Sequence, residues 1–442
     1  MEKSIKVGLI GFGTVGSGTA RILLEQQELL GSRAQVPIEL VTICDKDITS
    51  DRGFPVPDSL LTTNINDIFD NPEISIVIEL IGGTEPAKSF ILEAIKRGKH
   101  VVTANKALLA THGPEIFGAA AENNVEIGFE ASVGGGIPVI KSVKEGLVAN
   151  NIHTVMGIMN GTANYILSRM TDEGLPFNDV LKEAQARGYA EADPTYDIEG
   201  IDTAHKLAIL ATLAFGASAT LDDVDIEGIS RLSPIDMAFA KELGYHIKLL
   251  AIGRAVNDEV ELRVHPTMVP LGHLLAQVDG AYNAFYFIGD SVGKVLLYGM
   301  GAGQMPTGSA VVADVVDIAR NIRMNASNRI PSLGLPFEKL APLKKRPMES
   351  LSGRYYFRFA AVDQPGVLAR ISGVLAEYSI SIASVVQKGR GTEKSVPIVM
   401  LTHEAKEENV QKALGKIDNL DIVQDDTVVI RIEDLKSLEG TE

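Results

Sequence analysis

A glycine-rich loop near the N-terminus is the feature that most restricts how this chain can fold. A short apolar run at residues 7–10 leads directly into Gly11-Phe12-Gly13-Thr14-Val15-Gly16, and a helical pattern follows to about residue 30. In that setting the first glycine permits a tight turn, the second lets the backbone approach a pyrophosphate, and the third lets the helix pack closely. The loop is therefore predicted to bind a dinucleotide at the N-terminus of the helix.

The end of the next predicted strand, residues 38–43, is where a cofactor ribose is normally bound. This strand is followed by Cys44-Asp45-Lys46-Asp47. Asp45 can accept hydrogen bonds from a ribose diol and would repel a 2′-phosphate, whereas Lys46 would attract one. The two residues leave the choice between NAD and NADP open.

Strands and helices continue to alternate up to residue 130. Strands are predicted at residues 74–80, 100–103 and 125–130, and helices at residues 86–97 and 107–122. Strict alternation predicts an α/β fold with a parallel, doubly wound, Rossmann-like sheet.

Ligands of such sheets bind at the carboxyl ends of the strands, where Thr103 and Lys106 lie. Lys106 is therefore a candidate to reach the nicotinamide or the reacting oxygen. The alternative is a solvated lysine that opens a surface helix.

Residues 188–206 gather five carboxylates and a lysine in nineteen residues. A proline and a glycine mark the first part of this segment as a loop, and the apolar spacing of residues 201–215 predicts a helix. Asp202 and Lys206 then lie one turn apart on the same face. A solvated ion pair is the simplest interpretation, and a catalytic cluster is the alternative that the other motifs favour.

Composition excludes several classes of protein. The 442 residues include 41 basic and 57 acidic side chains, which gives a net charge of −16 and argues against a nucleic-acid partner. The single cysteine, Cys44, excludes a disulfide framework, and the histidines lack the spacing of zinc ligands. No apolar run approaches the roughly 18 residues that a membrane span needs. These features predict a soluble, cytoplasmic protein without a membrane partner.

Further motifs follow in order. They are Ala131-Ser132-Val133-Gly134-Gly135-Gly136-Ile137-Pro138, Met156-Gly157-Ile158-Met159-Asn160-Gly161-Thr162-Ala163-Asn164-Tyr165, the acidic segment, and Tyr298-Gly299-Met300-Gly301-Ala302-Gly303-Gln304-Met305-Pro306-Thr307. Because these motifs occur in this order after the glycine loop, residues 4–330 resemble the homoserine dehydrogenase family. The resemblance implies reversible hydride transfer between L-homoserine and L-aspartate 4-semialdehyde with NADP or NAD, in the biosynthesis of threonine, methionine and isoleucine.

The resemblance also implies roles for matching residues. Lys206 would be the general acid and base, because a desolvated ammonium group can polarise a carbonyl and lose its proton more easily. Asp202, one turn earlier, would orient Lys206. Lys106 would bridge cofactor and substrate. The substrate would be held by Glu191, Asp197, Gly161 and Thr162. The cofactor would also contact Thr103, Gly188 and Gly303.

The same resemblance implies a monovalent cation, usually sodium, held largely by backbone carbonyl oxygens. The matching positions are Glu130, Val133, Gly135 and Ile137. It further implies association through the strands of the central region, whose edges need covering, as a homodimer or homotetramer.

A second domain type is predicted near the C-terminus. Residues 325–352 have the composition of a linker. Beyond them, the predicted order is βαββαβ, with strands at residues 355–362, 380–387, 396–402 and 423–432 and helices at 365–378 and 407–417. The turn Asp363-Gln364-Pro365-Gly366-Val367-Leu368 resembles the signature of ACT regulatory domains. An effector would bind at Asp363, Pro365, Gly366, Val367 and Leu368, and threonine is the expected one. A domain used only for subunit contact is the alternative.

These patterns predict a nucleotide-binding domain at residues 1–130, completed by 307–330. An α+β substrate and dimerisation domain is predicted at 131–306, a linker at 331–352 and an ACT domain at 353–434. Because only a few residues precede the first strand, no fused aspartate kinase is expected. A different dehydrogenase would share the glycine loop without needing Glu191, Asp202 and Lys206 together, and a sensor that merely retains nucleotide would not need the lysine.

Overall fold

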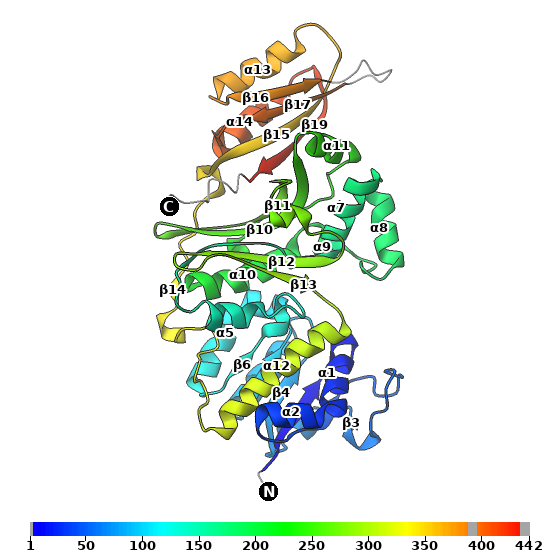
Figure 1. Ribbon diagram of the computed structural model, residues 1–442, viewed down its shortest axis with the longest axis vertical. Coiled ribbons are helices and arrows are strands. Elements are labelled where there is room, and N and C mark those ends of the chain that lie inside the picture. The colour runs from blue at the N-terminus through cyan, green and yellow to red at the C-terminus, as the bar shows by residue number, and fades with distance from the viewer. Residues whose placement is uncertain (1–2, 388–395, 434–442) are drawn as a thin grey trace.

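The computed structural model describes residues 3–387 and 396–433, which form three stacked layers of structure. Figure 1 shows the N-terminal sheet at one end of the long axis, a second sheet with its helices in the middle, and the C-terminal strands and helices at the other end. The predicted start of the nucleotide-binding domain, residue 1, and the predicted end of the ACT domain, residue 434, lie outside the described residues. No helix in the described ranges combines the length and the apolar character needed to cross a membrane.

The N-terminal sheet is parallel and has the strand order β3-β2-β1-β4-β5-β6. This is the doubly wound order of the Rossmann fold, and it confirms the predicted fold class. The strands are β1 (Ile5–Ile10), β2 (Ile38–Cys44), β3 (Leu61–Thr62), β4 (Ile74–Glu79), β5 (His100–Thr103) and β6 (Ile127–Gly128). The helices are α1 (Thr14–Glu25), α2 (Gln27–Ala34), α3 (Asn66–Phe69), α4 (Ala87–Lys96) and α5 (Lys106–Glu122).

Two predicted elements differ from the structure. The helix after the glycine loop is broken at Gln26, whose backbone (φ −115°, ψ 27°) leaves the helical region, so that α1 and α2 are separate. The strand predicted at residues 125–130 is reduced to β6, since the N–H of Glu130 donates to Asp314 instead of a strand neighbour.

Helix α12 (Gln304–Arg323) returns from the middle of the chain to pack on α1 (Figure 1). The two helices touch at Gly18 and Gly308, where a side chain on Gly308 would place its Cβ 2.9 Å from the backbone of Gly18. Small residues therefore permit this close crossing, and the apolar face of α12 shares a core with β1.

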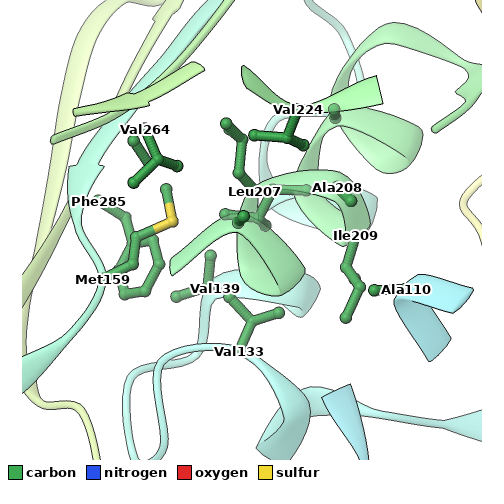
Figure 2. Close-up of a cluster of buried hydrophobic side chains, with 14 of the residues drawn as sticks. Ala110, Val133, Val139, Met159, Leu207, Ala208, Ile209, Val224, Val264 and Phe285 are labelled. Carbon is green, nitrogen blue, oxygen red and sulfur yellow. The ribbon is translucent and has the colours of Figure 1, made fainter. Parts of the chain in front are cut away.

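The middle layer pairs a sheet with a buried helix. Its strands are β7 (Ile152–Ile158), β10 (Tyr245–Val256), β11 (Glu259–Pro270), β12 (Tyr282–Gly289) and β13 (Gly293–Met300), with the short strands β8 (Ala217–Ser218) and β9 (Asp225–Ile226). Its helices are α6 (Val139–Lys141), α7 (Gly161–Glu173), α8 (Phe177–Ala186), α9 (Thr195–Ile198), α10 (Ile201–Phe215) and α11 (Pro234–Glu242). Figure 2 shows Leu207 and Ile209 of α10 among apolar side chains from several elements, including Met159 and Phe285. Burial in this core fixes the helix.

The C-terminal layer has the predicted βαββαβ order, with one additional two-residue strand before its second helix. Its elements are β15 (Ser352–Ala361), α13 (Val367–Glu377), β16 (Ile382–Gln387), β17 (Val396–Thr402), β18 (Ala405–Lys406), α14 (Glu407–Ile417) and β19 (Val423–Ile432). Strand β19 also pairs in parallel with β11, through Thr267 with Arg431 and Met268 with Ile432. The middle and C-terminal strands therefore form one continuous mixed sheet, which the strand pattern did not predict.

The segment predicted as a linker lies against folded structure. Strand β14 (Ala341–Pro342) pairs with β8, and Lys344 accepts a backbone hydrogen bond from Val260 of β11 at 2.9 Å. The ring of Phe337 lies over α5, where a Cβ on Gly118 would come within 3.2 Å of it. The segment therefore contacts both the N-terminal layer, at α5, and the middle layer, at β8 and β11.

A buried ion cluster lies where the middle and C-terminal parts of the continuous sheet meet. Glu433, just after β19, receives one hydrogen bond of 2.5 Å from Arg254 of β10 and another of 2.5 Å from Arg263 of β11. Burial alone would raise the pKa of this carboxyl, but the two guanidinium groups outweigh that effect and lower the pKa to about 2. The folded state therefore favours the ionised form of Glu433.

This lowered pKa predicts an acid-sensitive junction. The stabilisation is present above the ordinary glutamate pKa of about 4.3 and is lost as the pH falls toward 2, at a cost of about 3 kcal/mol. In Glu433→Gln we expect a lower melting temperature at neutral pH and a smaller further loss between pH 5 and pH 3, measured by calorimetry. Glu404→Gln, at an exposed acid of the same layer, should behave like the unmodified protein. Equal pH dependence in Glu433→Gln and the unmodified protein would contradict the prediction.

Candidate active site

A cavity of about 520 Å³ lies where the carboxyl edge of the N-terminal sheet meets the middle layer. The glycine loop contributes Thr14 and Val15, and α5 contributes Lys106. The other walls come from the segments predicted as motifs. They include Asn160, Gly161, Thr162, Gly188, Asp197, Asp202, Lys206 and Gly303. Residues far apart in sequence are thus brought to one cleft.

Asp202 and Lys206 form a buried ion pair at the start of α10. The helix begins after Gly200, which has a left-handed backbone (φ +80°), and the two side chains lie one turn apart. Lys206 Nζ lies 2.7 Å from Asp202 Oδ2 and donates a second hydrogen bond to the carbonyl of Met159 at 2.6 Å. Both residues are less than a tenth exposed, so the pair is not the solvated one that the sequence allowed.

Lys106 reaches the same carboxylate from the N-terminal layer. It is the first residue of α5, whose N-terminus is capped by the side chain of Asn105, and its Nζ lies 3.0 Å from Asp202 Oδ1. Each oxygen of Asp202 therefore faces one ammonium group. A single carboxylate joins the two layers that form the cleft.

Asn160 organises the acidic side of the cavity and had no role in the sequence prediction. Its side-chain nitrogen donates to Asp197 at 2.7 Å and to Asp202 at 2.9 Å, while its oxygen caps α7 by accepting from Ala163 N–H at 2.8 Å. The available signal was an asparagine directly before a helix, which is a preferred N-cap. Only the fold shows that this cap also holds two carboxylates.

Burial and charge separate the proton affinities of these groups. Burial lowers the pKa of Lys206, whereas the adjacent Asp202 raises the pKa of Lys106. Burial works to raise the pKa of Asp202, but the two ammonium groups hold it well below its usual range. Burial also raises the pKa of Asp197. Lys206 is consequently the ammonium that loses its proton more readily, as a general acid and base requires.

The remaining substrate candidates lie around the cavity. Gly161 starts α7, and a Cβ there would lie 2.7 Å from the carbonyl oxygen of Ala281. Thr162 is buried, and its hydroxyl donates to the carbonyl of Tyr189. Glu191 is exposed and lines an adjoining hollow of about 330 Å³, which shares Lys106, Asp197 and Asp202 with the cavity.

The glycine loop has the geometry that its sequence predicted. A Cβ on Gly11 would lie 2.7 Å from the backbone of Leu80, and one on Gly16 would lie 2.0 Å from the carbonyl oxygen of Gly11, so neither position accepts a side chain. A Cβ on Gly13, in contrast, would meet no atom within 4 Å. The loop is therefore open at the glycine that is expected to face a pyrophosphate.

The residues expected to bind the ribose and nicotinamide differ in accessibility. The Asp45 carboxylate accepts from the N–H groups of Phe12 and Asp47, while Lys46 is exposed. Thr103 is fully buried, and its hydroxyl donates to Glu79 at 2.7 Å, so that side chain does not line the cavity. Gly188 and Gly303 line the cavity itself.

The four candidate cation ligands lie on one bend that leads into α6. The carbonyl oxygens of Val133 and Gly135 accept no hydrogen bond from any described residue, which suits a hard cation that prefers oxygen ligands. The Glu130 carboxylate accepts from two N–H groups of α6, and burial raises its pKa to about 7. Ile137 offers a carbonyl that already accepts from Val139. The described residues contain no cluster of His, Cys, Asp and Glu side chains that could hold a metal ion.

The candidate effector residues lie at the turn between β15 and α13. Asp363, Pro365, Gly366 and Leu368 are exposed, and Gly366 has a left-handed backbone (φ +92°) at the start of α13. Val367 is 4% exposed and belongs to the core of the C-terminal layer. Of the five candidates, only Val367 therefore faces the core, and the other four are accessible from solvent.

Comparison with known proteins covers nearly the whole chain. Residues 11–130 match the homoserine dehydrogenase NAD-binding domain, residues 138–316 match homoserine dehydrogenase, and residues 355–421 match the ACT domain. The homoserine dehydrogenases of Pseudomonas aeruginosa and Neisseria gonorrhoeae are 47% and 44% identical to this chain. Each alignment spans 98% of this chain and 100% or 99% of the relative, respectively.

Solved structures agree with these matches. A homoserine dehydrogenase from Thiobacillus denitrificans is 50% identical, with a TM-score of 0.92 over 98% of this chain and 99% of that one. A hyperthermophilic archaeal homoserine dehydrogenase mutant, whose structure is a complex with NADPH, is 25% identical, with a TM-score of 0.60 over 71% of this chain and 97% of that one.

The Rossmann sheet and the buried lysine and carboxylate cluster at its carboxyl edge define an NAD(P)-dependent oxidoreductase that acts on a CH–OH group. It carries a C-terminal ACT domain. The chain belongs to the homoserine dehydrogenase family, because family matches and relatives of more than 40% identity extend over almost its full length.

The position of Asp202 predicts the pH response of the site. In Asp202→Asn the carboxylate that favours the ammonium form of Lys206 is gone while Lys106 remains, so the pKa of Lys206 falls further. We expect homoserine oxidation to slow about 100-fold and the inflection of its pH–rate profile to move to lower pH, measured by steady-state kinetics. Asp193→Asn, at an exposed acid of the same segment, should leave the inflection in place. An unshifted inflection in Asp202→Asn would refute this assignment of charge.

Proposed function

We propose that the chain interconverts L-homoserine and L-aspartate 4-semialdehyde at this cleft, with Lys206 as the group that donates and accepts the proton. The observation that carries the proposal is the burial of Lys206 beside one carboxylate, in a cavity that also contains the nucleotide loop. A desolvated lysine of lowered pKa suits proton transfer to an aldehyde oxygen and from an alcohol.

The nicotinamide cofactor, when bound, supplies or accepts the hydride. In the direction of reduction, the Lys206 ammonium gives a proton to the carbonyl oxygen of the aldehyde. In the direction of oxidation, neutral Lys206 removes that proton from the hydroxyl of homoserine. Asp202 holds Lys206 in place, and Lys106 contributes a second positive charge that favours a developing alkoxide.

The acidic side of the cavity is proposed to bind the substrate. Glu191 and Asp197 are suited to the substrate's ammonium group, because charge-assisted hydrogen bonds to a carboxylate are strong. Gly161 and Thr162, at the N-terminus of α7, line the same cavity as Asp197 and Lys206. Asn160 holds Asp197 and Asp202 in place by donating a hydrogen bond to each.

The nucleotide is proposed to bind along the carboxyl edge of the N-terminal sheet. The loop from Gly11 to Gly16 would hold its phosphates, and the backbone near Gly188 and Gly303 would enclose its nicotinamide end. The buried side chain of Thr103 would stabilise this edge through its hydrogen bond to Glu79. Asp45 and Lys46 remain the candidates that select NAD or NADP, and the ratio of kcat/KM for the two cofactors measures that selection.

The other expected features are retained as proposals. The bend at Glu130, Val133, Gly135 and Ile137 would hold sodium through carbonyl oxygens. Association into a homodimer or homotetramer would use the edge strand β13. The half-exposed ring of Tyr298 on this strand stacks on that of Tyr282 in β12, with the ring centroids 5.1 Å apart. We also propose a cytoplasmic location. The division of the chain into nucleotide-binding, substrate, linker and ACT segments is proposed with the boundaries predicted from the sequence.

Lys206→Met tests the catalytic role. We expect kcat to fall about 1000-fold or more in both directions, because the proton donor and acceptor is gone. In the unmodified enzyme, oxidation should rise with pH and level off above the lowered pKa of Lys206, whereas reduction should be fastest below that pKa. Both inflections should disappear in the variant, measured with NADP and NAD in turn.

Lys248 offers a matched control, since it is a buried lysine that pairs with Asp279 at 3.0 Å outside the cleft. Lys248→Met should retain kcat and both inflections in the fraction that folds. Homoserine turnover that survives in Lys206→Met would disprove the role of that residue.

We further propose that L-threonine binds at the turn formed by Asp363, Pro365, Gly366, Val367 and Leu368 and inhibits the enzyme. The support is the ACT match together with an exposed acid and a helix N-terminus at this turn. In Asp363→Ala the threonine concentration for half inhibition should rise about tenfold, because one charge-assisted hydrogen bond is lost, while activity without threonine is unchanged. Asp426→Ala, at an exposed acid of the same layer, should keep normal inhibition. Identical inhibition curves for Asp363→Ala and the unmodified enzyme would exclude this turn.

A further inference from the structure

Glu79 is a fully buried carboxyl group that the proposed reaction does not use. It is the last residue of β4, in the middle of the N-terminal sheet, between Ile10 of β1 and Thr103 of β5. Burial raises its pKa, and it has no ion-pair partner within the described ranges. A buried acid without a cation is costly, so its hydrogen bonds must offset that cost.

Two neighbouring loops supply those hydrogen bonds. One carboxylate oxygen accepts from the N–H of Ile81 at 2.8 Å, in the loop after β4. The other accepts from the hydroxyl of Thr103 at 2.7 Å, at the end of β5. Glu79 therefore ties together the two turns that end the neighbouring strands β4 and β5.

From Thr103 the connection continues to the catalytic cluster. The hydroxyl of Thr103 accepts from the N–H of Asn105 at 3.0 Å, and the side chain of Asn105 donates to the carbonyl of Gly83 at 2.6 Å while capping α5. The next residue is Lys106, whose Nζ contacts Asp202. Gly83, Asn105 and Lys106 all line the hollow beside the cavity. Each link in this series is a direct hydrogen bond or a chain neighbour.

We propose that Glu79 is a positioning residue that sets the place of Lys106 relative to Asp202 by fixing the turn on which Lys106 is carried. This inference rests on the proposed function, because it assigns Glu79 to the same site through Lys106. Glu79 touches neither the cavity nor Asp202, so its effect on the reaction passes through the turn at Thr103 and Asn105.

Glu79→Gln removes one acceptor and keeps the size of the side chain. If its amide oxygen accepts from Ile81 N–H, its NH2 group faces Thr103 and can only donate, so the Thr103 hydroxyl must turn and the link between the two turns is weakened. We expect kcat to fall about 10-fold to 100-fold, since small displacements of a catalytic group have effects of this size. The KM for homoserine should rise a few-fold, measured by steady-state kinetics. Glu79→Leu, which has no acceptor, should be slower still.

Glu126 is the matched control for burial of a carboxyl group. It lies next to β6, away from the cavity, and its carboxylate accepts from Asn321 and Asn328 at 2.8 Å each, with burial raising its pKa. Glu126→Gln should lower the melting temperature by an amount similar to Glu79→Gln and leave kcat and KM unchanged. A kcat that falls equally in both variants would show that loss of stability alone is responsible and would overturn the proposal.

A double-mutant cycle with Lys106→Met separates positioning from a general structural effect. If Glu79 acts through Lys106, Glu79→Gln should slow the reaction by less than about twofold once Lys106 is absent. The same 10-fold to 100-fold factor in both backgrounds would overturn the proposal, as would full activity of Lys106→Met. Failure of the proposed function is distinguishable, because it appears as absent homoserine turnover in the unmodified enzyme.

Discussion

The carboxylate of Asp202 faces two lysines, one from each of the layers that form the cleft. Lys206 approaches one oxygen from the same helix, and Lys106 approaches the other from α5 of the Rossmann layer. Without this acid, the ammonium group of Lys106 would repel that of the buried Lys206 and favour loss of its proton. One residue therefore contributes both to the contact between the layers and to the proton affinity of Lys206, and Asn160 stabilises that residue by a further hydrogen bond.

The helices that carry these groups are held at their opposite ends by the segment before the ACT domain. Phe337 packs over α5, and Ala341 donates a backbone hydrogen bond to Gly216 at 3.0 Å, directly after α10. The same segment reaches β11, which pairs with β19 of the C-terminal layer. The ACT layer is thus connected to the catalytic helices by packing and by a continuous sheet, with the ion cluster at Glu433 closing the junction.

Local sequence signals were strong where a short segment carries its own structure. The glycine loop, the α10 helix at 201–215 and the βαββαβ order of the C-terminal layer follow from spacing and turn residues, and the structure has them. The break at Gln26 was missed, although its backbone hydrogen bonds with Ile22 and Leu30 are local. The short β6 was also missed, because the competing hydrogen bond of Glu130 with Asp314 joins residues far apart in the chain. The pairing of β11 with β19 was missed for the same reason.

The sequence by itself determined the Rossmann layer, the family and the side chains able to carry proton transfer, since these depend on residue types in short motifs. Tertiary structure decided which of them meet. It turned Asp202 and Lys206 from an apparently solvated pair into a buried one, brought Lys106 to the same carboxylate, and revealed Asn160 and Glu79 as supports. Burial and the approach of charges from distant segments set these properties, and neither is encoded in local spacing.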